Sequence, residues 1–198
     1  MKKKIIVTIS LFLMFLIGCS KNKIEPYDFF NSSFEEGNLN GWISEGSAFS
    51  NDFISYRKYD DLGNPFNQEG RYFYYGGAKE GSFTGTLTSE PVKVKGNGIV
   101  SFYLGAGKNS ELAYVSFFYQ DKEVIRVFNN GFDGTDSMFQ HTVDLSSYVG
   151  KKVTIVITDA DVMEDGFNYL NVDNFIFNYQ GPYEESMKVK KANQYIIE

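Results

Sequence analysis

Apolar and polar residues alternate along much of this chain with a period of two. In each of the ranges 100–104, 113–119, 153–157 and 175–179, apolar side chains occupy every second position. Strict alternation is typical of β-strands, because successive side chains of a strand point to opposite faces of the sheet. The pattern therefore predicts a protein built mainly from strands.

Turn residues separate these alternating segments. Gly96–Gly98, Gly105–Gly107, Asn129–Gly131 and Asp133–Gly134 are glycine-rich clusters, and Gln120–Glu123 has the composition of a tight hairpin. About ten candidate strands follow one another at the spacing expected of a β-sandwich, and no amphipathic helix of normal length lies between them. The predicted fold class is all-β.

Composition agrees with this prediction. Aromatic residues make up 17% of the 198 positions, with 19 Phe, 14 Tyr and a single Trp, and glycine is also frequent at 19 residues. Aromatic side chains favour strands and glycines favour turns. The length is that of one ordinary domain with a sizeable core.

The N-terminus has a different pattern. Three lysines, Lys2 to Lys4, precede an apolar stretch from Ile5 to Ile17, and Leu16-Ile17-Gly18-Cys19 follows. This layout is typical of a secretory signal, and the final four residues resemble the lipobox of bacterial lipoproteins. The resemblance implies cleavage before Cys19 and acylation of the cysteine. The alternative, an uncleaved transmembrane anchor, needs about 20 apolar residues, which is longer than this stretch.

The expected organisation follows from these segments. Residues 1–18 form a lipoprotein signal peptide, 19–27 a polar tether, 28–180 the β-sandwich, and 181–198 a tail that either starts a short helix at Pro182 or stays loose. Acyl chains on Cys19 would hold the mature protein at the cell membrane, facing outside the cytoplasm. Acylation also removes the only cysteine from disulfide or catalytic chemistry.

Net charge limits the possible partners. The 19 basic residues fall to 16 once Lys2, Lys3 and Lys4 are removed, and against 25 acidic residues this leaves a net charge of −9. An acidic protein is a poor partner for nucleic acid, anionic lipid or polyanionic glycans. Neutral sugars remain compatible with this charge.

Several segments carry a family resemblance. Asn31–Trp42 resembles the opening strand of jelly-roll carbohydrate-binding modules. Pro65–Phe73 and Thr84–Ser89 resemble the module attached to levanases and other fructan-degrading glycoside hydrolases, within the galactose-binding-like superfamily. Three further segments continue in the same order: Gly98–Gly105, Asp144–Lys151 and Leu170–Phe175. The resemblance covers Phe29 to Tyr179 and implies a jelly-roll β-sandwich. The function stays open, because jelly rolls host many activities.

The resemblance also implies a structural calcium ion between the first and last strands, with Glu35 and Asp173 at the matching ligand positions. Calcium takes six to eight oxygen ligands, so backbone carbonyls would have to complete the shell. The alternative is that both carboxylates are solvated or hydrogen-bonded turn residues. In one place the chain departs from its relatives: Phe167-Asn168-Tyr169 replaces a Trp-Gly-His stretch, which leaves ligand specificity open.

Two loops are candidates for sugar binding, because sandwich loops gather at the sheet ends and carry function. The first holds Tyr56, Arg57, Asp60 and Asp61; the second holds Asp161 and Asn168 in an acidic stretch that could also hold a second calcium ion. Either loop could instead be simply solvated. Trp42 is expected in the core rather than at a sugar platform.

Catalytic motifs are absent from the sequence: there is no nucleophile elbow, metalloprotease helix or phosphate loop. The only histidine, His141, falls on an apolar strand face and is expected to pack there. The predicted function is therefore non-catalytic carbohydrate binding at the cell surface. The alternatives are a surface module for protein interaction or adhesion, and a hydrolase whose acid pair only the fold would reveal.

Overall fold

The computed structural model describes residues 23–78, 83–129, 131, 133–162, 166–181 and the backbone of 194–195. The strands are β1 (Trp42–Gly46), β2 (Ile54–Ser55), β3 (Phe73–Tyr75), β4 (Gly85–Ser89), β5 (Val92–Lys93), β6 (Ile99–Ala106), β7 (Ala113–Tyr119), β8 (Lys122–Val127), β9 (Met138–Asp144), β10 (Lys152–Asp159), β11 (Leu170–Phe177) and β12 (Gln194–Tyr195). Three 3-10 turns complete the assignment: η1 (Asn51–Phe53), η2 (Gly76–Ala78) and η3 (Ser146–Tyr148).

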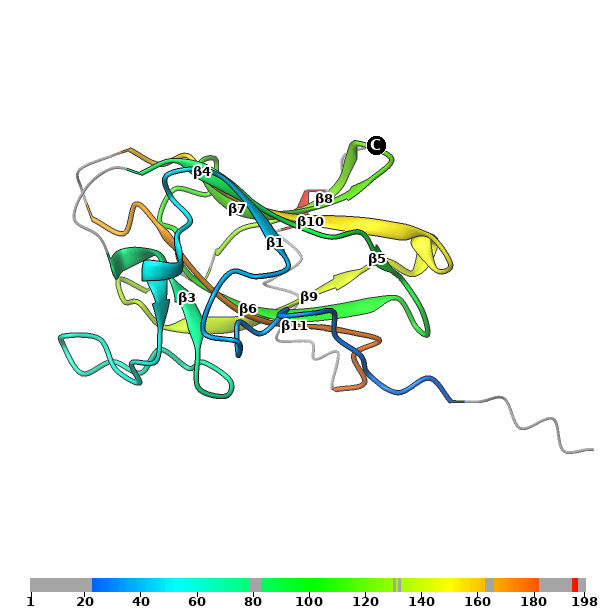
Figure 1. Cartoon of the computed structure of the whole chain (residues 1–198), viewed down its shortest axis with the longest axis horizontal. Coiled ribbons are helices and arrows are strands. Elements are labelled where there is room, and N and C mark those ends of the chain that lie inside the picture. Colours follow the sequence, from blue (N-terminus) through cyan, green and yellow to red (C-terminus); the bar gives the residue numbers. More distant parts are fainter. Residues whose placement is uncertain are drawn as a thin grey trace, which may run out of the picture.

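The strands form two antiparallel sheets that face each other (Figure 1). The first sheet has the order β1-β4-β10-β7-β8-β12, with β5 paired to β10, and the second has the order β2-β3-β11-β6-β9. Within them, β4-β10-β7-β8 and β3-β11-β6-β9 are the two four-stranded sheets of a jelly roll. From one of these eight strands to the next, the chain crosses between the sheets at every step except the β7–β8 hairpin. The predicted jelly-roll β-sandwich is confirmed.

The core lies between the sheets and contains the alternating residues of the sequence pattern. Leu87, Phe117 and Ile155 of the first sheet and Phe102 and Val172 of the second are all completely buried. Such side chains are removed from water on both sides of the interface, which is the main source of stability in a protein without disulfides.

Trp42 and His141 lie in this core. Trp42 is buried, and its indole N–H donates a hydrogen bond of 2.9 Å to the Asn31 carbonyl. His141 is buried in β9 with its ring stacked 5.8 Å from Phe102. Both residues therefore pack as expected. The tight hairpin is also confirmed, since Gln120 and Asp121 have φ angles of 49° and 61° and link β7 to β8 in two residues.

The predicted opening strand over 31–42 is wrong. This segment consists of turns and loop up to Gly41, and β1 begins only at Trp42. Asn31 and Phe34 have φ angles of 54° and 57°, in the left-handed region, which interrupts regular extended backbone twice within four residues. The Asn31 side chain organises these turns, because its amide donates to the carbonyls of Asn38 and Asn40.

A β-bulge changes the alternation within β11. Leu170 and Val172 face the core, and after the bulge Phe175 and Phe177 do so, because the register with β6 shifts between Asp173 and Ile176. Asn174, in the bulge, has a φ of 53°. Two residues then oppose one on the neighbouring strand, which switches the parity of the faces. Asp173 is thereby placed on the outer face of the second sheet.

The two ends of the sandwich carry different segments. At one end, called here the loop end, lie the connections β3–β4, β6–β7, β8–β9 and β10–β11, since Leu170 pairs with Ala106 and Asp159 pairs with Gly85. At the other, the tether end, Tyr27 bridges to Phe177, the last residue of β11. Figure 1 shows the N-terminal segment leaving from this second end.

Some predictions concern residues outside the described part of the chain: the signal peptide and lipobox up to Cys19, the first residues of the tether (19–22), and the helix start at Pro182. Of the tail, Gln194–Tyr195 forms β12 and pairs with β8. Among the described residues, no helix has the length and apolar character needed to cross a bilayer.

Candidate binding sites at the loop end

The loop between β2 and β3 covers the outer face of the second sheet. Its Phe66 is completely buried, with its ring 4.9 Å from Phe73 and 5.0 Å from Tyr75. Met138 joins the same cluster and its N–H donates 2.9 Å to the Phe66 carbonyl. This second, smaller hydrophobic cluster fixes the loop against the sheet and so positions the polar residues that flank it.

A cavity of about 460 Å³ lies where this loop meets the end of β3. It is lined by Asp52, Phe53, Ile54, Ser55, Tyr56, Arg57, Asp61, Tyr75, Gly77 and Ala78. We call it the Arg57 cavity. Tyr56 is 67% exposed at its rim. Gly77 is required in its wall, because a Cβ at this position would lie 2.6 Å from the Tyr169 ring.

Arg57 is the central charge of this cavity. It forms an ion pair with Asp61, and its guanidinium lies 6.0 Å from the centre of the Tyr75 ring. Burial raises the pKa of Tyr75 to about 12, and the negative charge of Asp136 adds to this shift. Tyr75 is therefore a neutral hydroxyl at physiological pH, next to a planar cation and its carboxylate partner.

Asp60 points into its own turn rather than toward a ligand. Its Oδ1 accepts from the N–H groups of Leu62 and Asn64, and its Oδ2 accepts from the Asn64 side chain at 2.8 Å. The Asn64 side-chain hydrogen bond is the main cause that lowers the pKa of Asp60. Of the two adjacent aspartates, Asp61 therefore lines the cavity and Asp60 shapes the loop.

A buried polar cluster behind the cavity was not foreseen from the sequence. Asp136 accepts a hydrogen bond of 2.8 Å from the Tyr169 hydroxyl and one of 3.4 Å from the Tyr75 hydroxyl. The Asn171 amide donates to the Asp136 carbonyl at 2.8 Å. Burial raises the pKa of Asp136. The only indication of this cluster in the sequence was Tyr169, which lies in the stretch 167–169 that departs from the modules that the chain resembles.

The second predicted loop is described only in part, because residues 163–165, among them Glu164 and Asp165, lie outside the described residues. Asp161 is only 2% exposed, Asn168 is half-buried, and the Asp161 N–H donates to Asp159. Asp159 is itself buried, which raises its pKa to about 7. Neither Asp161 nor Asn168 lines the Arg57 cavity. A role of these two residues in sugar binding, or in a second calcium site, remains a prediction.

The structure brings the two predicted calcium ligands to one region. Asp173 is completely buried; its Oδ2 accepts from the Glu69 N–H at 2.9 Å, and its Oδ1 receives no hydrogen bond. Burial, together with the charges of Glu35 and Glu69, raises the pKa of Asp173 to about 8. Glu35 Oε1 accepts from the N–H groups of Arg71 and Tyr72 at 2.9 Å.

These groups have the chemistry of a calcium site. A buried carboxylate oxygen without a donor, close to a second carboxylate, is a suitable ligand for a hard cation. Glu69 was not foreseen, and it lies near both, with its side chain held by the Tyr103 hydroxyl at 3.0 Å. Within the described ranges, no three acidic, histidine or cysteine side chains are close enough to form a metal site. Backbone carbonyls would have to supply the other ligands.

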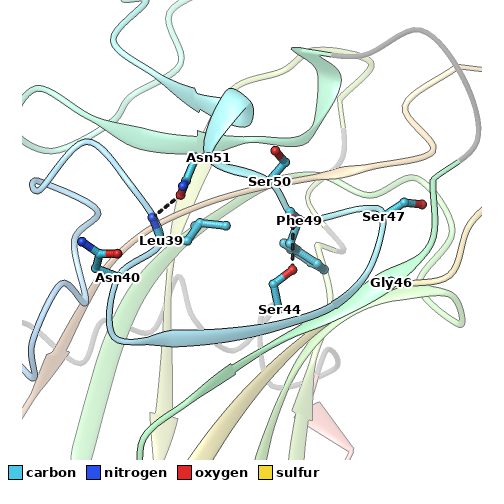
Figure 2. Close-up of a pocket in the computed structure, with 8 residues that line it drawn as sticks. All are labelled: Leu39, Asn40, Ser44, Gly46, Ser47, Phe49, Ser50 and Asn51. Atoms are coloured by element: carbon cyan, nitrogen blue, oxygen red, sulfur yellow. Dashed lines mark hydrogen bonds between the residues drawn. The ribbon is translucent and has the colours of Figure 1, made fainter.

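A second cavity, of about 520 Å³, lies beside β1 (Figure 2). Its polar side chains mostly serve the local backbone. Asn51 accepts from the Leu39 N–H at 2.8 Å, and the Ser44 hydroxyl donates to the Phe49 carbonyl at 2.7 Å. These bonds explain how the turn after β1 is held, and they leave the Arg57 cavity as the stronger candidate site.

No protein-family model matches the sequence, and no curated protein matches it. Solved structures of similar shape include the K3 adhesin domain of Lys-gingipain from Porphyromonas gingivalis w83 (13% identity, TM-score 0.43, 73% of this chain and 95% of that one). A second is the module TmCBM61 in complex with β-1,4-galactotriose (17% identity, TM-score 0.46, 75% of this chain and 96% of that one). A third is a cyclase from Fischerella sp. TAU (17% identity, TM-score 0.44, 77% of this chain and 95% of that one). At these identities and TM-scores, the similarity supports no particular activity for this chain. Only the chain's own residues bear on its function.

Proposed function

We propose that this protein is a lipid-anchored surface lipoprotein whose β-sandwich binds a neutral glycan, such as a fructan, in the Arg57 cavity without catalysis. The observation that carries the proposal is the composition of that cavity. It combines the ion pair of Arg57 and Asp61, an exposed aromatic ring at Tyr56 and the ring of Tyr75 in its wall.

These groups suit a sugar. Guanidinium and carboxylate groups can each hold two adjacent hydroxyls in a bidentate manner, and an aromatic face offers an apolar surface to a sugar ring. The cavity is large enough for one or a few sugar units, at about 460 Å³. Net acidity of the mature chain favours a neutral glycan over a polyanion. The sequence resemblance to modules of fructan-degrading enzymes supports the choice of fructan.

The calcium ion belongs to the same proposal as a structural element. Glu35, in the turns before β1, and Asp173, in β11, would both ligate it, so that the ion links segments far apart in the sequence. It would supply positive charge beside a buried carboxylate and thereby stabilise the fold that carries the cavity. The ion has no role in the proposed binding chemistry.

Calorimetry tests the glycan proposal. Levan, inulin and their oligomers are titrated into the purified mature protein and into its Arg57→Ala variant. A hydrogen bond to a charged group is typically worth about 1.5–3 kcal/mol, so the variant is expected to bind about tenfold more weakly or worse, with an unchanged circular dichroism spectrum. Arg71→Ala is the matched control, because Arg71 is exposed and stacks on Tyr72 outside the cavity.

Two results would contradict this proposal. Absence of heat with every neutral glycan argues against sugar binding as such. If glycan binding is unaffected by Arg57→Ala and by Asp61→Ala, the protein binds the glycan at another site. The loop that carries Asp161 and Asn168 is then the next candidate.

A second candidate function is protein interaction. The tip of the β2–β3 loop exposes two large side chains, Tyr59 at 60% and Leu62 at 86%. Exposed apolar side chains on a projecting loop suit a protein surface better than a sugar. If this candidate is correct, neutral glycans give no heat, and Leu62→Ser lowers the adhesion of cells that display the protein.

A further inference from the structure

Four lysines converge at the tether end of the sandwich. Lys93 of β5 lies directly opposite Lys152 of β10 in the antiparallel pairing. Lys151 and Lys95 are their chain neighbours, and the Val94 N–H donates 2.9 Å to the Lys151 carbonyl. All four side chains are exposed. We call this group the lysine patch.

Among the described residues, no carboxylate forms an ion pair with the lysine patch. None of its four ammonium groups lies within ion-pair distance of an acidic group in the described part of the chain, although Glu90, Asp121 and Asp144 are at the same end. Lys95 and Lys151 lie instead over tyrosine rings, 4.9 Å from Tyr27 and 4.8 Å from Tyr119. Like charges directly opposite each other on paired strands destabilise a sheet. Two lysines that face each other across paired strands and have no acidic partner therefore favour an external anionic partner.

The chain enters the fold through this patch. The Tyr27 hydroxyl donates to the Lys93 carbonyl and accepts from the Lys95 N–H, both at 2.7 Å. Only the seven residues from Ser20 to Pro26 separate Tyr27 from Cys19. Seven extended residues span at most about 25 Å. If Cys19 is acylated, the lysine patch is held within that distance of the membrane surface.

Acidic residues occur at both ends of the sandwich. Glu90, Asp121 and Asp144 are at the tether end, and Asp61 is at the loop end, where it pairs with Arg57. What distinguishes the lysine patch is therefore that its ammonium groups lack an acidic partner, and not the net charge of its end.

We propose that the lysine patch docks on the anionic phospholipid headgroups of the membrane that carries the lipid anchor, and so holds the sandwich upright with the loop end facing outward. This inference rests on the lipid anchor of the proposed function. The net negative charge of the whole chain does not oppose it, because charges more than about 10 Å from the surface are screened at physiological salt. Docking presents the Arg57 cavity to the exterior.

The test uses the mature protein reconstituted into vesicles of phosphatidylcholine alone or mixed with phosphatidylglycerol. A fluorophore on Ser147→Cys, an exposed residue of η3 at the tether end, reports contact with a quencher on lipid headgroups. Quenching is expected only with phosphatidylglycerol and is expected to weaken at high salt. A label on Leu62→Cys, at the loop end, is expected to stay unquenched.

Lysine variants then test whether the lysine patch is responsible for docking. Lys93→Gln with Lys152→Gln is expected to lower the ratio of docked to undocked protein by about tenfold or more. Lys93→Arg with Lys152→Arg keeps the charges and is expected to keep docking. The matched control, Lys58→Gln with Lys108→Gln, removes two charges at the loop end and is expected to change nothing. Unchanged melting curves show that each variant is folded.

The inference is overturned if quenching at position 147 is equal in the two kinds of vesicle, or if the Gln pair docks like the wild type. Mass spectrometry of the same preparation reports whether Cys19 is acylated. Without acylation the anchor proposal fails by itself. Sedimentation with phosphatidylglycerol vesicles then still tests the patch, since only binding that the Gln pair abolishes supports it.

Discussion

Asp173 places a carboxyl group at a completely buried position, with one oxygen that receives no hydrogen bond. Burial raises the pKa of this group to about 8, whereas in the unfolded chain it is close to about 3.9. Between these values the folded state holds the proton and the unfolded state does not. The metal-free protein should therefore gain stability as the pH falls through 8 and lose it as the pH rises through 8.

Asp173→Asn should change both the pH dependence and the response to calcium. In EDTA at pH 8 or above, the variant should melt at a higher temperature than the wild type, because its amide carries no charge and offers an N–H beside Glu35 and Glu69. Calcium should stabilise the wild type, by about 2.7 kcal/mol at a hundredfold excess over its dissociation constant, and should not stabilise the variant. Scanning calorimetry over pH 5–9 measures both effects.

Asp121→Asn is the matched control for this prediction, because Asp121 is exposed in the β7–β8 turn. It should respond to pH and calcium as the wild type does. Asp159, with a pKa raised to about 7, contributes a pH dependence of the same sign that remains in every variant. A wild type that is indifferent to calcium and EDTA would remove the metal site from the proposed function.

At the scale of elements, the β2–β3 loop is an unusual covering layer. Its one buried side chain is Phe66, whose backbone also bonds to Lys58 and to Met138 of β9. Its position determines where Arg57 and Asp61 lie. The same loop supplies Glu69 to the region of Asp173. Both candidate sites therefore depend on how this loop packs.

Phe66→Ala should open the loop while the main core stays folded. Loss of a buried Phe side chain costs about 3–5 kcal/mol, and here the loss falls on the smaller cluster outside the sandwich. We expect a lower melting temperature, faster proteolysis within 56–72 and weaker glycan binding. Phe30→Ala is the control, because Phe30 is 63% exposed and its removal should have little effect. Full glycan affinity in a folded Phe66→Ala protein would show that the cavity does not need the loop's anchor.

At the scale of the whole molecule, the jelly roll separates the tether from the Arg57 cavity. β11 connects the two ends: Phe177 bridges to Tyr27 at the tether end, and Asn171 pairs with Tyr75 at the cavity. A strand rises by about 3.3 Å per residue, so the eight residues of β11 separate the ends by roughly 25 Å. If the chain is anchored through Cys19 as proposed, this arrangement places the Arg57 cavity at the end away from the anchor.

Cys19→Ser should release the protein from the membrane. The variant cannot be acylated, and the remaining sandwich has no membrane-spanning helix among its described residues. Fractionation of cells should move it from the membrane to the soluble or secreted fraction, and mass spectrometry should show no acyl mass. Arg71→Ala, processed normally, should stay with the membrane. Partition of Cys19→Ser with membranes at the level of the wild type would contradict the lipoprotein assignment.

Local pattern was sufficient for most strands. The alternation in β6, β7 and β10, the two-residue turn at Gln120–Asp121 and the burial of Trp42 all follow from side chains and neighbours a few residues apart. The jelly-roll order came from the resemblance across several segments, since alternation alone does not specify which strands pair.

The sites depended on contacts that no local pattern encodes. The choice of Asp61 over Asp60, the burial of Asp161 and the approach of Glu69 to Asp173 each involve residues that are far apart in sequence or turned by a loop. The bulge at Asn174 decides on which face Asp173 lies, and a single positive φ produces it. Strand periodicity is a local property of the chain, whereas the position of a loop depends on the surface that the assembled sheets offer it.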